Sequence, residues 1–137
     1  MKKMIYKADR ETEVLCEGSY LGYNFVIVSY GTHPCAYVEI PKDNPFYLVD
    51  YDKLEDDITC HGGLTYSGTL DHIYNDLSRW FIGWDYAHAG DYNSYSALFD
   101  LDAGQKDKKW TTEEIYEEVM NVVEQLRGVS HERQSNN

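Results

Sequence analysis

The 137-residue sequence lacks several common signatures of chemistry. Its three cysteines, Cys16, Cys35 and Cys60, form no CxxC pair, so neither a redox motif nor a zinc knuckle is indicated. No GxGxxG, GxxxxGK[ST] or GxSxG segment is present, so no dinucleotide site, P-loop or serine-hydrolase elbow is indicated. Apolar runs such as residues 25–28 are too short to span a bilayer, and the first residues do not resemble a signal segment. We therefore expect a cytoplasmic protein with no membrane association.

Basic residues are also scarce. Lys and Arg number 12 against 24 Asp and Glu, which gives a formal charge of −12. This charge argues against direct binding to a nucleic-acid backbone or an anionic membrane. It is compatible with a basic host protein as partner, which an acidic inhibitor could bind by imitating nucleic acid through residues 50–57 and 113–118. Ordinary solubility is the alternative explanation of the acidity.

The remaining composition favours a folded protein, since 42% of the residues are apolar and 15% are aromatic. Strands are expected at residues 22–30, 35–40 and 80–86, and the first two of these should form an antiparallel hairpin. Residues 58–68 resemble a strand interrupted by glycines. Residues 4–16 could hold a short strand or a helical turn, and residues 69–78 a short helix or a long loop. Residues 46–54 are expected to be an ordered surface loop.

The C-terminal segment carries the strongest pattern in the sequence. Thr111 and Glu114 form a predicted capping box, and apolar residues then recur at helical spacing up to Leu126. Arg127 and Gly128 are typical of a helix end. These features predict a single α+β domain over residues 1–129, a mostly antiparallel sheet with a C-terminal amphipathic helix packed on it. Residues 130–137 should be a frayed polar tail.

Two segments differ chemically from the rest. In residues 61–68, HGGLTYSG, paired glycines interrupt an apparent strand and lie beside an imidazole and three hydroxyls. A glycine-rich bulge with solvent-facing hydroxyls is the structural alternative. Residues 83–92 contain Asp85, His88 and Asp91, which are spaced three residues apart. These side chains could bind a metal, or a carboxylate could orient a histidine base. Here the alternative is turn residues with an exposed His88.

If the two segments are neighbours, their side chains could share one pocket with aromatic walls. We predict the ligand-binding residues His61, Thr65, Tyr66, Ser67, Trp84, Tyr86 and Asp91. Tyr92 would add to the wall, His61 and His88 are the candidate catalytic residues, and a divalent metal would lie at Asp85, His88 and Asp91. An ordinary aromatic core is the alternative. His33 and His72 are expected to be surface residues.

These segments, together with Gly22-Tyr23 and residues 33–41, 44–47 and 51–52, resemble a set of small, mostly uncharacterised proteins encoded by phages and prophages. The resemblance covers about residues 22–92, and this chain departs from it by a longer polar stretch at residues 71–79. It implies a phage accessory protein, with a counter-defence role as one expectation.

Three functions follow as hypotheses. The first is capture of a small polar, nucleotide-derived ligand in the pocket. The second is a metal-dependent hydrolase that uses His61, Asp85, His88 and Asp91. The third is the acidic inhibitor of a host protein.

Overall fold

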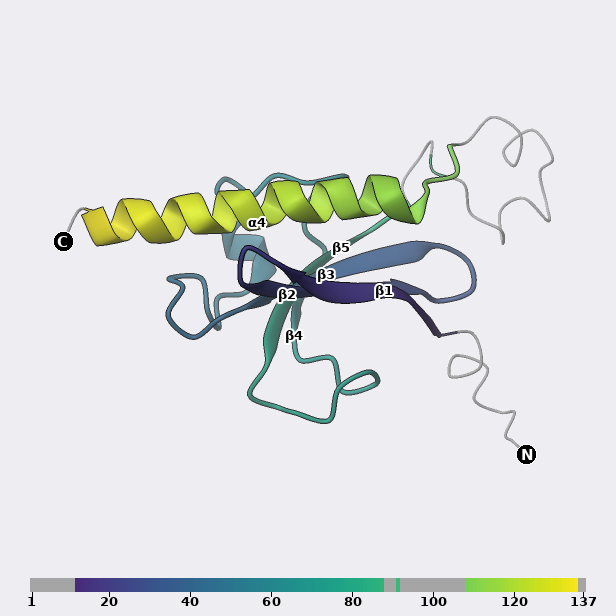
Figure 1. Cartoon of the computed structure of the whole chain (residues 1–137), viewed down its shortest axis with the longest axis horizontal. Helices are drawn as coiled ribbons and strands as arrows, with labels where there is room; N and C mark the ends of the chain where they lie inside the picture. Colours follow the sequence, from purple (N-terminus) through teal and green to yellow (C-terminus); the bar gives the residue numbers. More distant parts are fainter. Residues whose placement is uncertain (1–11, 88–90, 92–107, 136–137) are drawn as a thin grey trace.

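A five-stranded antiparallel sheet and one long helix form the structure, a computed structural model that describes residues 12–87, 91 and 108–135 (Figure 1). The sheet has the order β1-β2-β3-β5-β4. The elements in chain order are β1 (Glu13–Tyr20), β2 (Tyr23–Ser29), β3 (Pro34–Ile40), the 3-10 turn η1 (Tyr51–Lys53), β4 (Tyr66–Gly68), β5 (Trp80–Asp85) and α4 (Thr112–Ser135). The predicted α+β fold and the antiparallel β2–β3 hairpin are confirmed.

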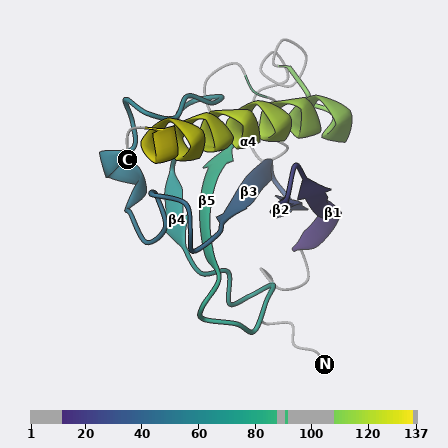
Figure 2. The same ribbon diagram turned by 60° about the vertical axis from the view of Figure 1, so that its left-hand side comes forward.

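Helix α4 lies across one face of the sheet (Figure 2). Its apolar stripe is fully covered, since five side chains are at most 1% exposed: Ile115, Val119, Val122, Val123 and Leu126. They pack with the alternate residues of the central strands, among them Ile27, Val38, Ile82 and Trp84. The central strands β2, β3 and β5 therefore direct alternate side chains into the core beneath the helix.

The other face of the sheet carries a second, smaller core. Val26, Val28, Cys35, Tyr37 and Phe81 pack there with Leu70 of the segment that joins β4 to β5. That segment, residues 69–79, consists of turns and irregular chain and lies on the side of the sheet away from α4 (Figure 1). Of the two alternatives for residues 69–78, the long loop is the one observed.

Residues 44–65 differ from the prediction in two ways. The segment 46–54 is not a surface loop throughout, because Phe46 and Leu54 are 5% and 1% exposed and belong to the helix-side core. Residues 58–65 are not a strand, since Gly62 and Gly63 adopt φ angles of 70° and 83° and turn the chain before β4 begins. Glycine reaches this left-handed region without steric cost.

Helix α4 also ends later than predicted. It continues through Gly128 to Ser135, so residues 130–135 of the expected tail are helical. A glycine ends a helix by adopting a positive φ, and Gly128 does not. Within the described part of the chain, no helix is long and apolar enough to cross a bilayer.

Candidate functional site

The two chemically distinctive segments lie side by side at one end of the sheet. β4 pairs antiparallel with β5, with Tyr66 opposite Gly83, and the Thr65 amide donates to the Gly83 carbonyl at 2.9 Å. The adjacency on which the predicted pocket depends is therefore present. The individual side chains, however, divide between the two faces of the sheet.

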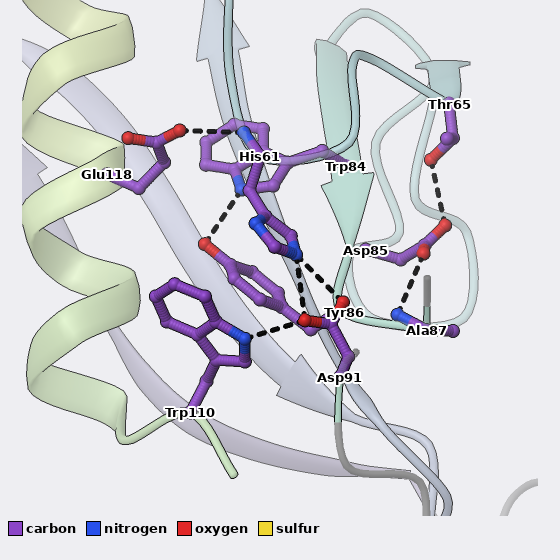
Figure 3. Close-up of polar contacts among 9 residues, drawn as sticks. All are labelled: His61, Thr65, Trp84, Asp85, Tyr86, Ala87, Asp91, Trp110 and Glu118. Atoms are coloured by element: carbon purple, nitrogen blue, oxygen red, sulfur yellow. Dashed lines mark hydrogen bonds and ion pairs between the residues drawn. The ribbon is translucent and has the colours of Figure 1, made fainter. Parts of the chain in front are cut away.

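His61 and Asp91 meet on the helix side (Figure 3). The Nε2 atom of His61 lies 3.0 Å from Oδ1 and 2.8 Å from Oδ2 of Asp91. The Trp110 indole Nε1 donates to the same carboxylate, 2.7 Å from Oδ1. Asp91 is only 6% exposed, so its charge is compensated by these two ring donors rather than by bulk water.

Aromatic rings surround this pair. The His61 ring stacks on Tyr86 with centroids 4.6 Å apart and an interplanar angle of 8°, and it meets the Trp110 ring edge-on at 4.8 Å. The Tyr86 hydroxyl accepts from Trp84 Nε1 at 3.1 Å, and burial raises the pKa of Tyr86 well above its ordinary value. The backbone N–H of His61 donates to Glu118 of α4 at 2.7 Å. The imidazole is thus held by the aromatic rings and by Asp91, and the His61 backbone is held by helix α4.

Asp85 belongs to the opposite face. It pairs with Cys35 in the β3–β5 ladder, and it alternates with Trp84, whose side chain lies in the helix-side core. Its carboxylate accepts from Thr65 Oγ1 and from the Ala87 amide, each at 3.1 Å. In Figure 3 this group lies apart from the His61–Asp91 pair. The structure therefore does not bring Asp85 and Asp91 together.

The metal prediction gains no support from these positions. His88 and Tyr92, named in the sequence analysis, lie outside the described residues. Among the residues that are described, no three His, Cys, Asp or Glu side chains gather closely enough to hold a metal ion. A site that binds Zn²⁺ or Ca²⁺ needs at least three protein ligands in most cases.

Three further members of the predicted ligand set have structural roles. Tyr66 packs edge-on against Tyr37 in the second core, with ring centroids 5.5 Å apart, and donates to the Thr69 carbonyl. Ser67 Oγ accepts from the backbone N–H at the start of η1, at 3.0 Å. Trp84 is 1% exposed and lies inside the core. Of the predicted set, His61, Tyr86 and Asp91 remain together, with Trp84 beneath them.

A cavity of about 320 Å³ opens beside this group, which we call the end pocket. Its walls come from the ends of several strands and from the chain just before α4, and the residues are Leu15, Ser29, Gly31, Thr32, His33, Pro34, Tyr86, Lys109 and Trp110. Tyr86 and Trp110 belong both to these walls and to the rings around His61. The cavity lies within the size range of small-molecule sites, about 300–1,000 Å³.

The polar groups of the end pocket favour an anion. Thr32 Oγ1 and His33 Nδ1 lie 3.0 Å apart, and Lys109 supplies an ammonium. The neighbouring Lys108 lies over the Trp110 ring, with Nζ 4.4 Å from its centroid, and pairs with Glu114 at 2.8 Å. No described residue that lines the pocket is acidic. The lining of the pocket therefore differs in charge from the chain as a whole, whose formal charge is −12.

Comparisons with known proteins give no assignment. No family model, curated protein or solved structure matches this chain.

Sequence reasoning missed most of the end pocket. His33 was expected to be an ordinary surface residue, and Lys109 carried no recognisable signal. His33 comes close to Tyr86 because the Tyr86 amide extends the β3–β5 pairing by donating to the Pro34 carbonyl at 3.0 Å, and Lys109 does so because the adjacent Trp110 ring packs against Tyr86. A histidine–proline turn at a strand start, followed by an aromatic partner strand, was the signal available in the sequence.

Cys35 and Cys60 do not provide a nucleophile. Burial raises the pKa of the Cys35 thiol to about 12, and burial together with Glu118 raises that of Cys60 to about 12. Both groups are therefore protonated and unreactive near neutral pH.

Proposed function

We propose that the end pocket captures a small planar ligand that carries an anionic group, with nucleotide-derived molecules as the leading class. The observation that carries this proposal is the combination of two aromatic walls, Tyr86 and Trp110, with His33 and Lys109 around one cavity. A heteroaromatic ring would pack against the aromatic walls. Its phosphate or carboxylate would accept hydrogen bonds from Lys109 and His33.

The energies of these contacts are sufficient for modest affinity. Stacking of a base on an aromatic side chain contributes about 1–3 kcal/mol. A hydrogen bond to a charged group contributes about 1.5–3 kcal/mol. The charge of −12 opposes an anionic ligand, but exposed charges are screened beyond a Debye length of about 8 Å at physiological ionic strength. Acidic residues farther than this from the cavity therefore oppose the ligand only weakly.

Capture is favoured over metal-dependent hydrolysis. His61 does not line the end pocket, and its Nε2 atom is directed at Asp91. Asp85 lies on the opposite face of the sheet. Catalysis needs a base within hydrogen-bond reach of the substrate, and the described residues of the pocket offer only His33 for such a role. Capture of a nucleotide signal also fits the phage accessory role, which rests on the sequence resemblance alone.

Isothermal titration calorimetry tests the proposal with four probes: adenosine monophosphate, adenosine, ribose 5-phosphate and inorganic phosphate. We expect the monophosphate to bind, and the probes that lack either the ring or the anion to bind at least tenfold more weakly. Lys109→Gln and His33→Asn should each weaken the monophosphate by about tenfold, which is 1.4 kcal/mol.

Two controls match these variants in residue type. Lys53→Gln changes an exposed lysine of η1, and His72→Asn changes an exposed histidine of the 69–79 loop, and neither lines the pocket. Both should bind as the parent protein does. No heat with any probe at millimolar concentration, or equal losses in the control variants, would refute the proposal.

A further inference from the structure

We infer that Asp91 and His61 are positioning residues for the end pocket: the carboxylate of Asp91, held by His61, fixes the Trp110 indole as one of its walls. The inference rests on the proposed function in so far as that wall is a ligand contact. The claim that Asp91 and His61 fix the position of the Trp110 indole applies to the protein without ligand.

Trp110 precedes α4 and lies in no strand or helix, so its ring is placed by side-chain contacts. The indole N–H donates to Asp91 Oδ1, and the ring lies edge-on to His61 and tilted against Tyr86, with centroids 4.8 Å and 5.3 Å away. Packing against Tyr86 restricts the distance of the ring, but a hydrogen bond restricts its orientation. Asp91 supplies that directional contact.

Asp91 in turn is oriented by His61. Both carboxylate oxygens lie within 3.0 Å of His61 Nε2, which limits rotation of the carboxylate. His61 is itself fixed, because its ring stacks on Tyr86 and its backbone N–H donates to Glu118 of α4. A chain of contacts therefore runs from helix α4 through His61 and Asp91 to the pocket wall (Figure 3).

The protein contains a matched control for this series of contacts. Asp85, the last residue of β5, is a half-buried aspartate whose carboxylate, like that of Asp91, accepts hydrogen bonds from two groups. Those bonds come from Thr65 and Ala87 on the opposite face of the sheet. Removal of the Asp85 carboxylate should therefore leave Trp110 unchanged, although it removes a similar charge.

The test is the indole ¹H–¹⁵N signal of Trp110 in the full chain without ligand, assigned by its loss in Trp110→Phe. We expect Asp91→Ala to shift this signal toward the position of a solvent-exposed indole and to lower its heteronuclear NOE. Asp91→Asn retains a carbonyl oxygen as acceptor and should restore most of the parent signal. Asp85→Ala should not move it.

An unmoved Trp110 signal in Asp91→Ala would overturn the inference, as would an equal shift in Asp85→Ala. If Asp91→Ala does not fold, His61→Leu serves instead, since it removes the donor that orients the carboxylate. His61→Gln, which keeps a side-chain N–H, should then recover part of the signal. The backbone amide spectrum of α4 shows whether each variant is folded.

Binding of adenosine monophosphate separates this inference from the proposed function. We expect at least tenfold weaker binding in Asp91→Ala and no change in Asp85→Ala. If the parent protein binds no probe, the proposed function fails. The indole signal still tests whether Asp91 and His61 fix the position of Trp110. If the parent binds and Asp91→Ala binds equally well, the wall formed by Trp110 is not a ligand contact and the inference fails alone.

Discussion

Gly83 offers a sharp test of how the central strands pack. A Cβ atom built at this position would lie 2.4 Å and 2.7 Å from two ring atoms of Tyr37 and 2.9 Å from the carbonyl oxygen of Ala36. The backbone oxygen cannot withdraw without disturbing the β3–β5 pairing, in which Tyr37 lies opposite Gly83. The Tyr37 ring is also held, because its hydroxyl lies 2.9 Å from that of Tyr30 and its ring packs against Tyr66.

Overpacking of a core by one methyl group costs about 1–3 kcal/mol. Because both neighbours of the new methyl group are fixed, we expect Gly83→Ala to lower the free energy of unfolding by about 3 kcal/mol. Urea denaturation followed by circular dichroism measures this. Gly128→Ala is the control, because nothing lies within 4 Å of its Cβ position in the helix. Since alanine favours a helix over glycine, this variant should stabilise the protein by about 0.5–1 kcal/mol.

The contact between Gly83 and Tyr37 allows a stricter check. In a Tyr37→Ala background the ring is gone and only the contact with the Ala36 carbonyl oxygen remains, so the cost of Gly83→Ala should fall by about 1 kcal/mol or more, as a coupling between neighbours. A Gly83→Ala variant within about 0.5 kcal/mol of the parent would refute the packing argument. An equal cost in both backgrounds would show that the strain comes from the backbone and not from the Tyr37 ring.

Three further predictions concern stability. Asn44→Ala should cost about 2–4 kcal/mol in urea denaturation, because this 3% exposed amide donates to Tyr23 and to the Leu126 carbonyl and accepts from the Phe46 amide; a loss below 1 kcal/mol would contradict it. Cys35 and Cys60 have folded-state pKa values of about 12 against an ordinary value of 9.0. The contribution of the two protonated thiols to the free energy of unfolding is therefore complete below pH 9 and is lost as pH rises toward 12. Each thiol should therefore lower stability between pH 8 and pH 10, by about 1 kcal/mol, and replacing either with alanine should remove its share. Thr111→Ala removes the acceptor that lies 3.1 Å from the Glu114 amide and should cost about 1 kcal/mol, whereas Thr112→Ala should cost less.

The parts of the fold that the sequence predicted are those with dense local patterns. The capping box formed as expected, with the Thr111 amide donating to Glu114 at 3.0 Å, because it needs only four consecutive residues. The apolar stripe of α4 was equally clear, since helical periodicity extends over several turns. The end of α4 was predicted wrongly at Gly128, because the glycine signal depends on a φ angle that composition does not determine.

The candidate site depended on longer-range information. Trp84, Asp85 and Tyr86 are consecutive, and strand alternation places Asp85 on the face opposite its neighbours. The sequence suggested one pocket from the closeness of these residues, whereas their alternation was the better guide. The His61–Asp91 pair was anticipated as a meeting of two segments, but its contact with Trp110 joins residues 19 positions apart. No local pattern encodes such a contact.

The β1–β2 hairpin, which the sequence analysis did not identify, leads to a last prediction. Leu21 and Gly22 connect the strands with φ angles of 51° and 87°, so both occupy the left-handed region that Asn-Gly would signal in a two-residue hairpin turn. Leu21 is 47% exposed and buries little in return for this conformation. A residue other than Gly, Asn or Asp loses about 1–2 kcal/mol there.

Leu21→Asn should therefore stabilise the protein by about 1 kcal/mol in urea denaturation, and Leu21→Val should destabilise it because a β-branched side chain tolerates a positive φ poorly. Leu48, with φ 66° and 61% exposure, provides an independent position where asparagine should act in the same direction. If Leu21→Asn lowers stability, the exposed leucine makes contacts that outweigh its backbone strain, and the turn is not the weak point of the hairpin.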